Sequence, residues 1–93
     1  MNRQICATVR VRGKVQGVCY RASTQETARA YGLKGWVRNL PDGSVEACFQ
    51  GEEQKVRAVI EWCRQGPPHA AIDSLDIDWE EVSESFANFS IRR

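Results

Sequence analysis

The order of strand-like and helix-like segments constrains the fold of this chain more than any other feature. Residues 5–12 alternate apolar with polar side chains, which is the period of two that a half-buried strand requires. Residues 53–65 instead place apolar side chains at i, i+3, i+4 and i+7, which predicts an amphipathic helix. The sequence Gly66-Pro67-Pro68 follows directly and ends this helix, because proline cannot continue helical hydrogen bonding.

Five further segments complete the pattern. Residues 23–31 contain no glycine or proline and are rich in helix formers, and Gly32 follows as a helix stop. Short apolar or alternating stretches predict strands at residues 35–39, 44–50, 72–79 and 86–91. The turn signal LPDG at residues 40–43 joins the first two of these strands into a hairpin.

The resulting order is β-α-β-β-α-β with one extra strand at the end. It predicts an α+β fold of the ferredoxin-like split β-α-β type, an antiparallel sheet of four to five strands with two helices on one face. The chain has 93 residues and contains no repeat or linker, so we expect residues 1–93 to form a single domain around one modest core.

Charge and cysteine usage exclude several classes of function. The net charge is +1, which provides no broad basic face for a nucleic acid. No apolar run is long enough to span a membrane and no signal peptide is visible, so we expect a cytoplasmic protein with no membrane partner. The four cysteines have no CxxC spacing and the chain has one histidine, His69, so a zinc site does not fit.

The segment between the first strand and the first helix carries the clearest chemical signal. Consecutive backbone N–H groups in such a loop can converge on one anion, and the positive end of a helix dipole lies beside them. Gly17 lets the backbone approach a ligand closely, and Arg21 can hold two oxygens with its planar fork. The alternative is an ordinary strand-to-helix turn with a surface arginine.

Asn39 is the second candidate, at the mouth of the predicted hairpin. Its amide both donates and accepts hydrogen bonds, so it can orient a water molecule. The alternative is that Asn39 is simply a turn residue, a common role for asparagine.

Two motifs in these segments together resemble the signatures of the acylphosphatase family. They are VxGxVQGVxYR at residues 11–21 and GWVRNxxxGxVxxxxxG at residues 35–51. The resemblance covers the whole chain in length and element order. Tyr20 departs from the family, which more often has phenylalanine there, and Cys19 falls at a variable position.

The resemblance implies a ferredoxin-like fold and hydrolysis of the carboxyl-phosphate bond of small-molecule acyl phosphates, with inorganic phosphate as a product. It implies that Arg21 and Asn39 are catalytic, Arg21 as the essential phosphate ligand and Asn39 as the residue that positions the attacking water. It further implies that the phosphate is bound by Gln16, Gly17, Val18, Cys19, Tyr20 and Arg21. No metal, no cofactor and no covalent intermediate are expected, and we expect a monomer.

The physics of phosphoryl transfer agrees with a site that consists only of backbone amides, one arginine and one asparagine. Its transition state is loose and carries charge on the equatorial oxygens, so positioning and electrostatics do most of the work. The leaving carboxylate has a pKa of about 4 and departs without a general acid. A second hypothesis, from a different class, is a non-catalytic domain that binds an anion or a partner through the same loop.

Two cysteines allow a structural prediction. Cys6 and Cys48 each occupy the polar phase of a predicted strand, so both are expected to point away from the helices. Their strands are neighbours in the ferredoxin-like order, which predicts thiols close enough to bridge under oxidation. The first of these cysteines also begins a C-x5-R pattern with Arg12, but the residues between them form a strand without glycine and cannot wrap around a phosphate.

Overall fold

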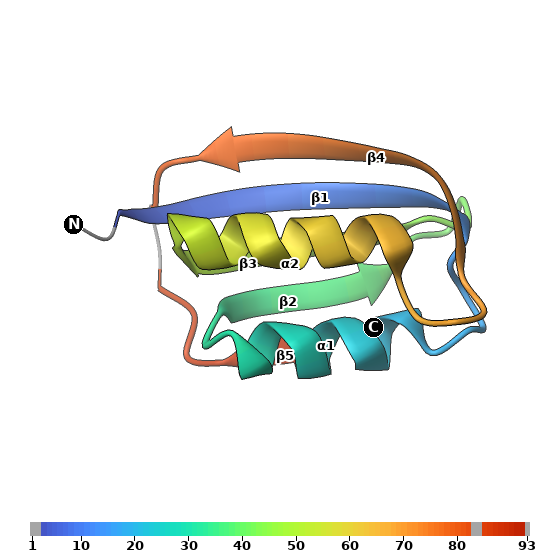
Figure 1. The fold of residues 1–93 in the computed structure, drawn as a ribbon, viewed down its shortest axis with the longest axis horizontal. Coiled ribbons are helices and arrows are strands. Elements are labelled where there is room, and N and C mark those ends of the chain that lie inside the picture. Colours follow the sequence, from blue (N-terminus) through green and yellow to red (C-terminus); the bar gives the residue numbers. More distant parts are fainter. Residues whose placement is uncertain (1–2, 83–84, 93) are drawn as a thin grey trace.

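The computed structural model describes residues 3–82 and 85–92, and the sheet is its organising element (Figure 1). Its strands are β1 (Gln4–Lys14), β2 (Lys34–Asn39), β3 (Val45–Glu52), β4 (Ala71–Glu80) and β5 (Phe89–Ile91). The helices are α1 (Tyr20–Ala30) and α2 (Glu53–Gln65), and both cover the same face of the sheet. The ferredoxin-like α+β arrangement predicted from the sequence is thereby confirmed.

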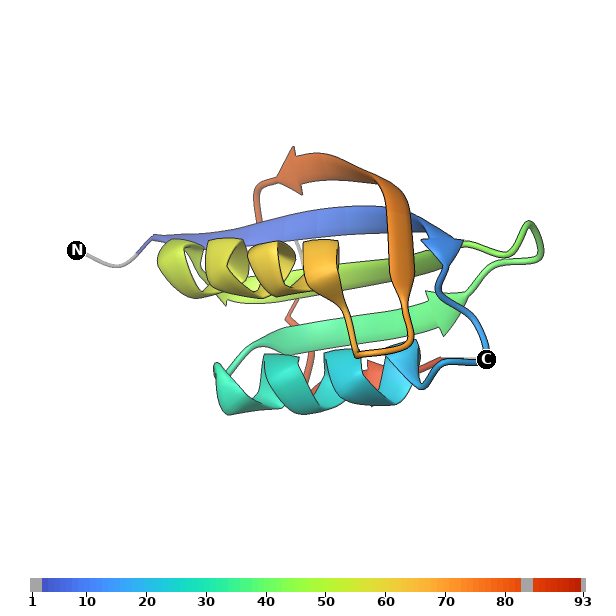
Figure 2. The same cartoon turned by 45° about the vertical axis from the view of Figure 1, so that its right-hand side comes forward.

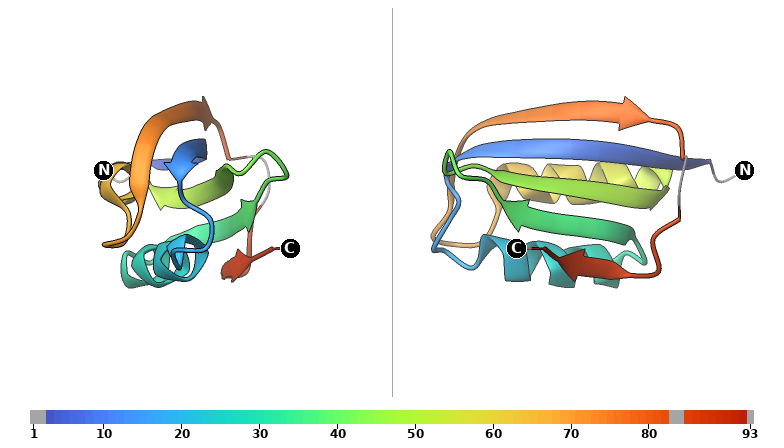
Figure 3. Two further views of the ribbon diagram at one scale, coloured as in Figure 1. Left: turned by 90° about the vertical axis from the view of Figure 1, so that its right-hand side faces the viewer. Right: turned by 180° about the vertical axis from the view of Figure 1, so that it is seen from behind.

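The strand order is β4-β1-β3-β2-β5. Strands β1, β2, β3 and β4 pair in antiparallel fashion, whereas β5 pairs with β2 in parallel. The sheet is therefore mixed and not wholly antiparallel as predicted. The reason is topological: the chain reverses direction after β4 and crosses to the other edge, where β2 already runs opposite to β4 (Figure 3).

Two element boundaries also differ from the prediction. Helix α1 begins at Tyr20, three residues before the predicted start, because the loop ends in a left-handed residue, Cys19, which turns the chain directly into the helix. The last strand begins at Phe89 rather than at residue 86, because Phe86 donates its backbone N–H to the side chain of Gln50 instead of to a neighbouring strand.

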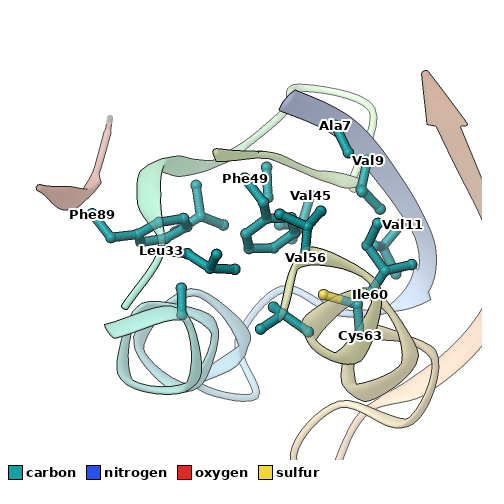
Figure 4. Close-up of a cluster of buried hydrophobic side chains, with 14 of the residues drawn as sticks. Ala7, Val9, Val11, Leu33, Val45, Phe49, Val56, Ile60, Cys63 and Phe89 are labelled. Carbon is teal, nitrogen blue, oxygen red and sulfur yellow. The ribbon is translucent and has the colours of Figure 1, made fainter. Parts of the chain in front are cut away.

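The core lies between the helices and the sheet. The alternation predicted for the first strand is confirmed, since Ala7, Val9 and Val11 are buried and belong to the core cluster. Figure 4 shows Ala7, Val9 and Val11 on the same side of the core as Ile60 and Cys63 of α2, Phe49 in the middle of the cluster, and Phe89 on the side of α1. The two phenyl rings stack with their centroids 5.5 Å apart.

This packing brings three segments together at one end of the molecule. Figure 2 shows that the loop from β1 to α1, the β2–β3 hairpin and the end of the chain after β5 all lie at this end. The segments are far apart in the sequence, so the sheet topology creates their contact. Among the described residues, no helix is both long enough and apolar enough to cross a membrane.

Candidate active site

The loop between β1 and α1 has the backbone shape of an anion-binding nest. Gly17 and Cys19 both adopt the left-handed conformation, with φ angles of 76° and 63°, on either side of Val18. Alternation of left-handed and ordinary residues turns successive N–H groups toward one concave side. A positive φ is uncommon outside glycine, so its presence at Cys19 marks a strained position that the surrounding structure maintains.

The backbone N–H groups at the end of this loop and the start of α1 have no partner in the part of the chain that the structure describes. The first backbone hydrogen bond of α1 runs from the N–H of Ser23 to the carbonyl of Cys19. Within the described residues, no hydrogen bond takes up the N–H groups of residues 17–22. These donors lie at the positive end of the helix dipole, an arrangement that favours an anion.

Asn39 reaches the same region from β2. It forms the last pair of the β2–β3 ladder, opposite Val45. Val37, two residues earlier, is fully buried beneath the helices, so strand alternation points Asn39 to that side as well. Its Oδ1 is buried and has no hydrogen-bond partner in the described part of the chain. A buried unpaired acceptor costs about 1–3 kcal/mol, which makes this atom a candidate for binding water or a ligand group.

Gln16 ties the loop to the hairpin. Its Nε2 donates to the backbone carbonyls of Leu40 and Ser44, each at 2.9 Å. These two carbonyls stand at the two ends of the hairpin turn, next to Asn39. The side chain of Gln16 therefore links the loop to the hairpin beside Asn39, and it leaves at most the backbone of Gln16 for an anion.

The hairpin turn is itself held by Asp42. Its Oδ1 accepts hydrogen bonds from the hydroxyl of Ser44, at 2.5 Å, and from the Ser44 backbone N–H, at 2.9 Å. Both bonds hold the pKa of the Asp42 carboxyl below its ordinary value, and the bond from the Ser44 hydroxyl is the larger cause. The stability they contribute is present above the unfolded-state pKa and is lost as the pH falls through the lower folded-state pKa.

A pocket of about 630 Å³ opens where the nest and Asn39 meet. Five of the seven residues predicted for the site line it, namely Gly17, Cys19, Tyr20, Arg21 and Asn39. Gln16 and Val18 do not; Gln16 turns to the hairpin, and Val18 packs against the core. Val15, Ala22 and Ile91 also line the pocket and were not predicted. The pairing of β5 with β2 brings Ile91 there, and the sequence carries no signal for that pairing.

Arg21 supplies the positive charge of this pocket. It is half-buried and, within the described residues, forms no ion pair or hydrogen bond. A guanidinium with free donors beside a nest of amides can hold two oxygens of one anion. Among the described residues, the side chains that line the pocket include no carboxylate or imidazole, and no group of three or more metal-ligating residues occurs.

Tyr20 anchors the start of α1. Tyr20 is 2% exposed, and the centroid of its ring lies 5.8 Å from that of Trp62. Its hydroxyl donates a hydrogen bond to the carbonyl of Cys63 at 2.7 Å. That carbonyl lies in the last turn of α2, where carbonyls lack helical partners, so the hydrogen bond gives a partner to both the Tyr20 hydroxyl and the Cys63 carbonyl. Burial is the main cause that raises the pKa of the Tyr20 phenol far above its usual range, which leaves it neutral.

The fold and this pocket define a class: small ferredoxin-like α+β domains with a nest-shaped loop before the first helix. The acylphosphatase family model matches residues 7–91, and the chain belongs to the acylphosphatase family, hydrolases that act on acyl phosphates. An acylphosphatase from Geotalea uraniireducens is 48% identical over 88 residues, covering 95% of this chain and 97% of the relative.

Solved acylphosphatase structures share the fold. The enzyme from Bacillus subtilis superposes with a TM-score of 0.93 at 30% identity, covering 96% of this chain and 99% of that one. The enzyme from Coxiella burnetii gives a TM-score of 0.86 at 40% identity, covering 98% and 94% of the two chains.

Removal of the Gln16 side-chain amide tests its positioning role. Gln16→Leu loses both bonds to the hairpin, so we expect kcat for an acyl phosphate to fall by about tenfold, because small displacements of a positioning group are costly. Gln25→Leu is the matched control, since Gln25 also donates to a backbone carbonyl, that of Phe89, but does not touch the hairpin. An equal loss of kcat in both variants would assign Gln16 to general stability.

Proposed function

We propose that this chain hydrolyses the carboxyl-phosphate bond of acyl phosphates to a carboxylate and inorganic phosphate, without a metal ion or cofactor. One observation carries the proposal: a single pocket joins a nest of backbone amides, an arginine and the buried Oδ1 of Asn39, none of which has a hydrogen-bond partner within residues 3–82 and 85–92. Membership of the acylphosphatase family supports it independently.

The phosphoryl group is proposed to bind in the nest. The N–H groups of residues 17–21 and the guanidinium of Arg21 hold its oxygens, and their charge matches the charge that grows there in the transition state. Catalysis then needs little rearrangement, because the left-handed residues of the loop have already aimed the amides.

Asn39 is proposed to orient the attacking water. Its Oδ1 accepts a hydrogen bond from the water, whose oxygen forms the new bond to phosphorus opposite the acyl oxygen. The bond from phosphorus to that acyl oxygen breaks, and the carboxylate leaves with the electron pair. A carboxylate of pKa about 4 needs no general acid. The water proton passes to a phosphate oxygen, since asparagine cannot act as a base at neutral pH.

The acyl group is proposed to occupy the rest of the pocket. At about 630 Å³ the pocket is far larger than a phosphate ion, and Ile91 provides an apolar wall on the β5 side. The proposed site is complete within one copy of the chain and needs no residue from a second copy. The proposal is a cytoplasmic monomer that acts on small molecules. The net charge of +1 is consistent with the proposed absence of a nucleic-acid partner.

The direct test is turnover of benzoyl phosphate in excess EDTA. We expect hydrolysis that the chelator does not change, competitive inhibition by inorganic phosphate, and far slower cleavage of glycerol phosphate, whose alkoxide must be protonated to leave. Phosphate binding without turnover would instead indicate a binding module. Loss of activity with EDTA would contradict the metal-free mechanism, and equal rates on both substrates would contradict the leaving-group argument.

A further inference from the structure

A pair of thiols lies on the face of the sheet opposite the helices. Cys6 of β1 and Cys48 of β3 have their Sγ atoms 3.1 Å apart, which confirms the proximity predicted from strand phase. The register pairs Cys6 with Gln50 and Cys48 with Thr8, so the two cysteines are diagonal neighbours. A disulfide holds its sulfurs at about 2.05 Å, so the thiols need to approach by only about 1 Å.

The pair is buried yet reachable. Cys6 is 8% exposed and Cys48 is 5% exposed. Both line a small pocket of about 160 Å³ together with Trp36, Glu80 and Phe86. The other two cysteines lack this arrangement, because Cys63 is enclosed in the core and Cys19 lies exposed in the nest.

We propose that Cys6 and Cys48 form a modification site at which small-molecule disulfides, of the class of oxidised glutathione, are reduced and a covalent link between β1 and β3 is made. One protein thiolate attacks the small disulfide, forming a mixed disulfide and releasing one small thiolate. The second protein thiolate attacks the protein sulfur of the mixed disulfide, closing the Sγ–Sγ bond and releasing the second small thiolate. Two electrons pass to the oxidant, and the protons of the two thiols end on the released small thiols.

The surroundings of the two thiols set the rate at which the link forms. The pKa of the Cys48 thiol is raised to about 12, mainly by burial and secondly by the hydrogen bond with Cys6. Among the described residues, Glu80 of β4 is the charged group that faces the pair across the pocket, and its negative charge acts in the same direction. The Cys48 thiolate is therefore scarce at neutral pH, so attack by Cys48 is slow and becomes faster as the pH rises.

The link stabilises the fold without touching the proposed active site. It joins two central strands at residues 42 positions apart, which restricts the unfolded chain more than the folded one. Asn39 faces the helices, on the opposite side of the sheet from the pair, so turnover is expected to stay within twofold. This inference does not depend on the proposed function.

The experiment equilibrates the reduced protein with mixtures of oxidised and reduced glutathione, alkylates it under denaturing conditions, and maps its peptides by mass. In the wild-type protein we expect an intramolecular link between the peptides of Cys6 and Cys48, and a melting temperature about 10 °C above that of the reduced protein. Cys6→Ser and Cys48→Ser should show neither result. Cys63→Ser, which removes a cysteine outside the pair, should still form the link.

Two results would overturn the proposal. The first is wild-type protein that retains free Cys6 and Cys48 thiols at every glutathione ratio, with adducts confined to Cys19. The second is a mapped link between Cys6 and Cys48 that leaves the melting temperature unchanged. Both are measured on the wild-type chain, so they remain decisive even if a serine variant fails to fold.

Discussion

Replacing Arg21 by glutamine is expected to lower kcat/KM for an acyl phosphate by at least about 10³-fold, the scale found when a charge-stabilising arginine is removed from phosphoryl transfer. Arg21 lines the pocket without an ion-pair partner in the described chain, so its guanidinium is available to the substrate. The affinity for inorganic phosphate should fall more than tenfold, because the same group holds the ground-state anion. Steady-state kinetics with phosphate as inhibitor measures both quantities.

Two companion variants make this result specific. Arg21→Lys keeps the charge but loses the planar fork, so we expect it to recover some phosphate affinity and little turnover. Arg29→Gln removes an exposed arginine in the last turn of the same helix and should behave as wild type. Turnover that survives in Arg21→Gln would remove the guanidinium from the mechanism.

Asn39→Ala is expected to lower kcat by about 10²–10³-fold, comparable to the loss of one positioned hydrogen-bonding group in other active sites. The inhibition constant for inorganic phosphate should change by less than threefold, because the nest and Arg21 remain. This split between turnover and affinity distinguishes a residue that orients water from one that binds phosphate. Equal losses of affinity in the Arg21 and Asn39 variants would contradict the division of roles.

The same substitution carries an expectation about stability. Oδ1 of Asn39 is buried and unpaired within the described chain, so removing it relieves an unfavourable burial. We expect the free energy of unfolding of Asn39→Ala to equal or exceed that of wild type in urea titrations. Asn88→Ala, at an exposed position before β5, is the control and should leave kcat unchanged. A less stable Asn39→Ala would mean that the side chain supports the fold instead.

Local patterns predicted most of the elements. The periodicity of residues 53–65 gave α2 with its observed bounds, because burial of one helix face requires that spacing. The strand phase placed Cys6 and Cys48 on one face, and the structure confirms this. The prediction of a wholly antiparallel sheet was wrong for β5, which pairs with β2 in parallel. The direction of β5 depends on which edge strand the chain reaches after β4, and the alternation of its three residues contains no information about that edge.

For the site, the two motifs already predicted which residues carry the proposed chemistry: the glycine and arginine of one motif and the asparagine of the other. Local features made them candidates, a glycine in a strand-to-helix loop and a polar side chain at the end of a strand, and the resemblance to the acylphosphatase motifs supplied their predicted roles. Three features came from the packing of the whole domain: Gln16 bonds to the hairpin, Ile91 lines the pocket, and the nest and Asn39 share that pocket. Those contacts join residues distant in sequence, and their energies depend on how the sheet is ordered and packed, which no local pattern records.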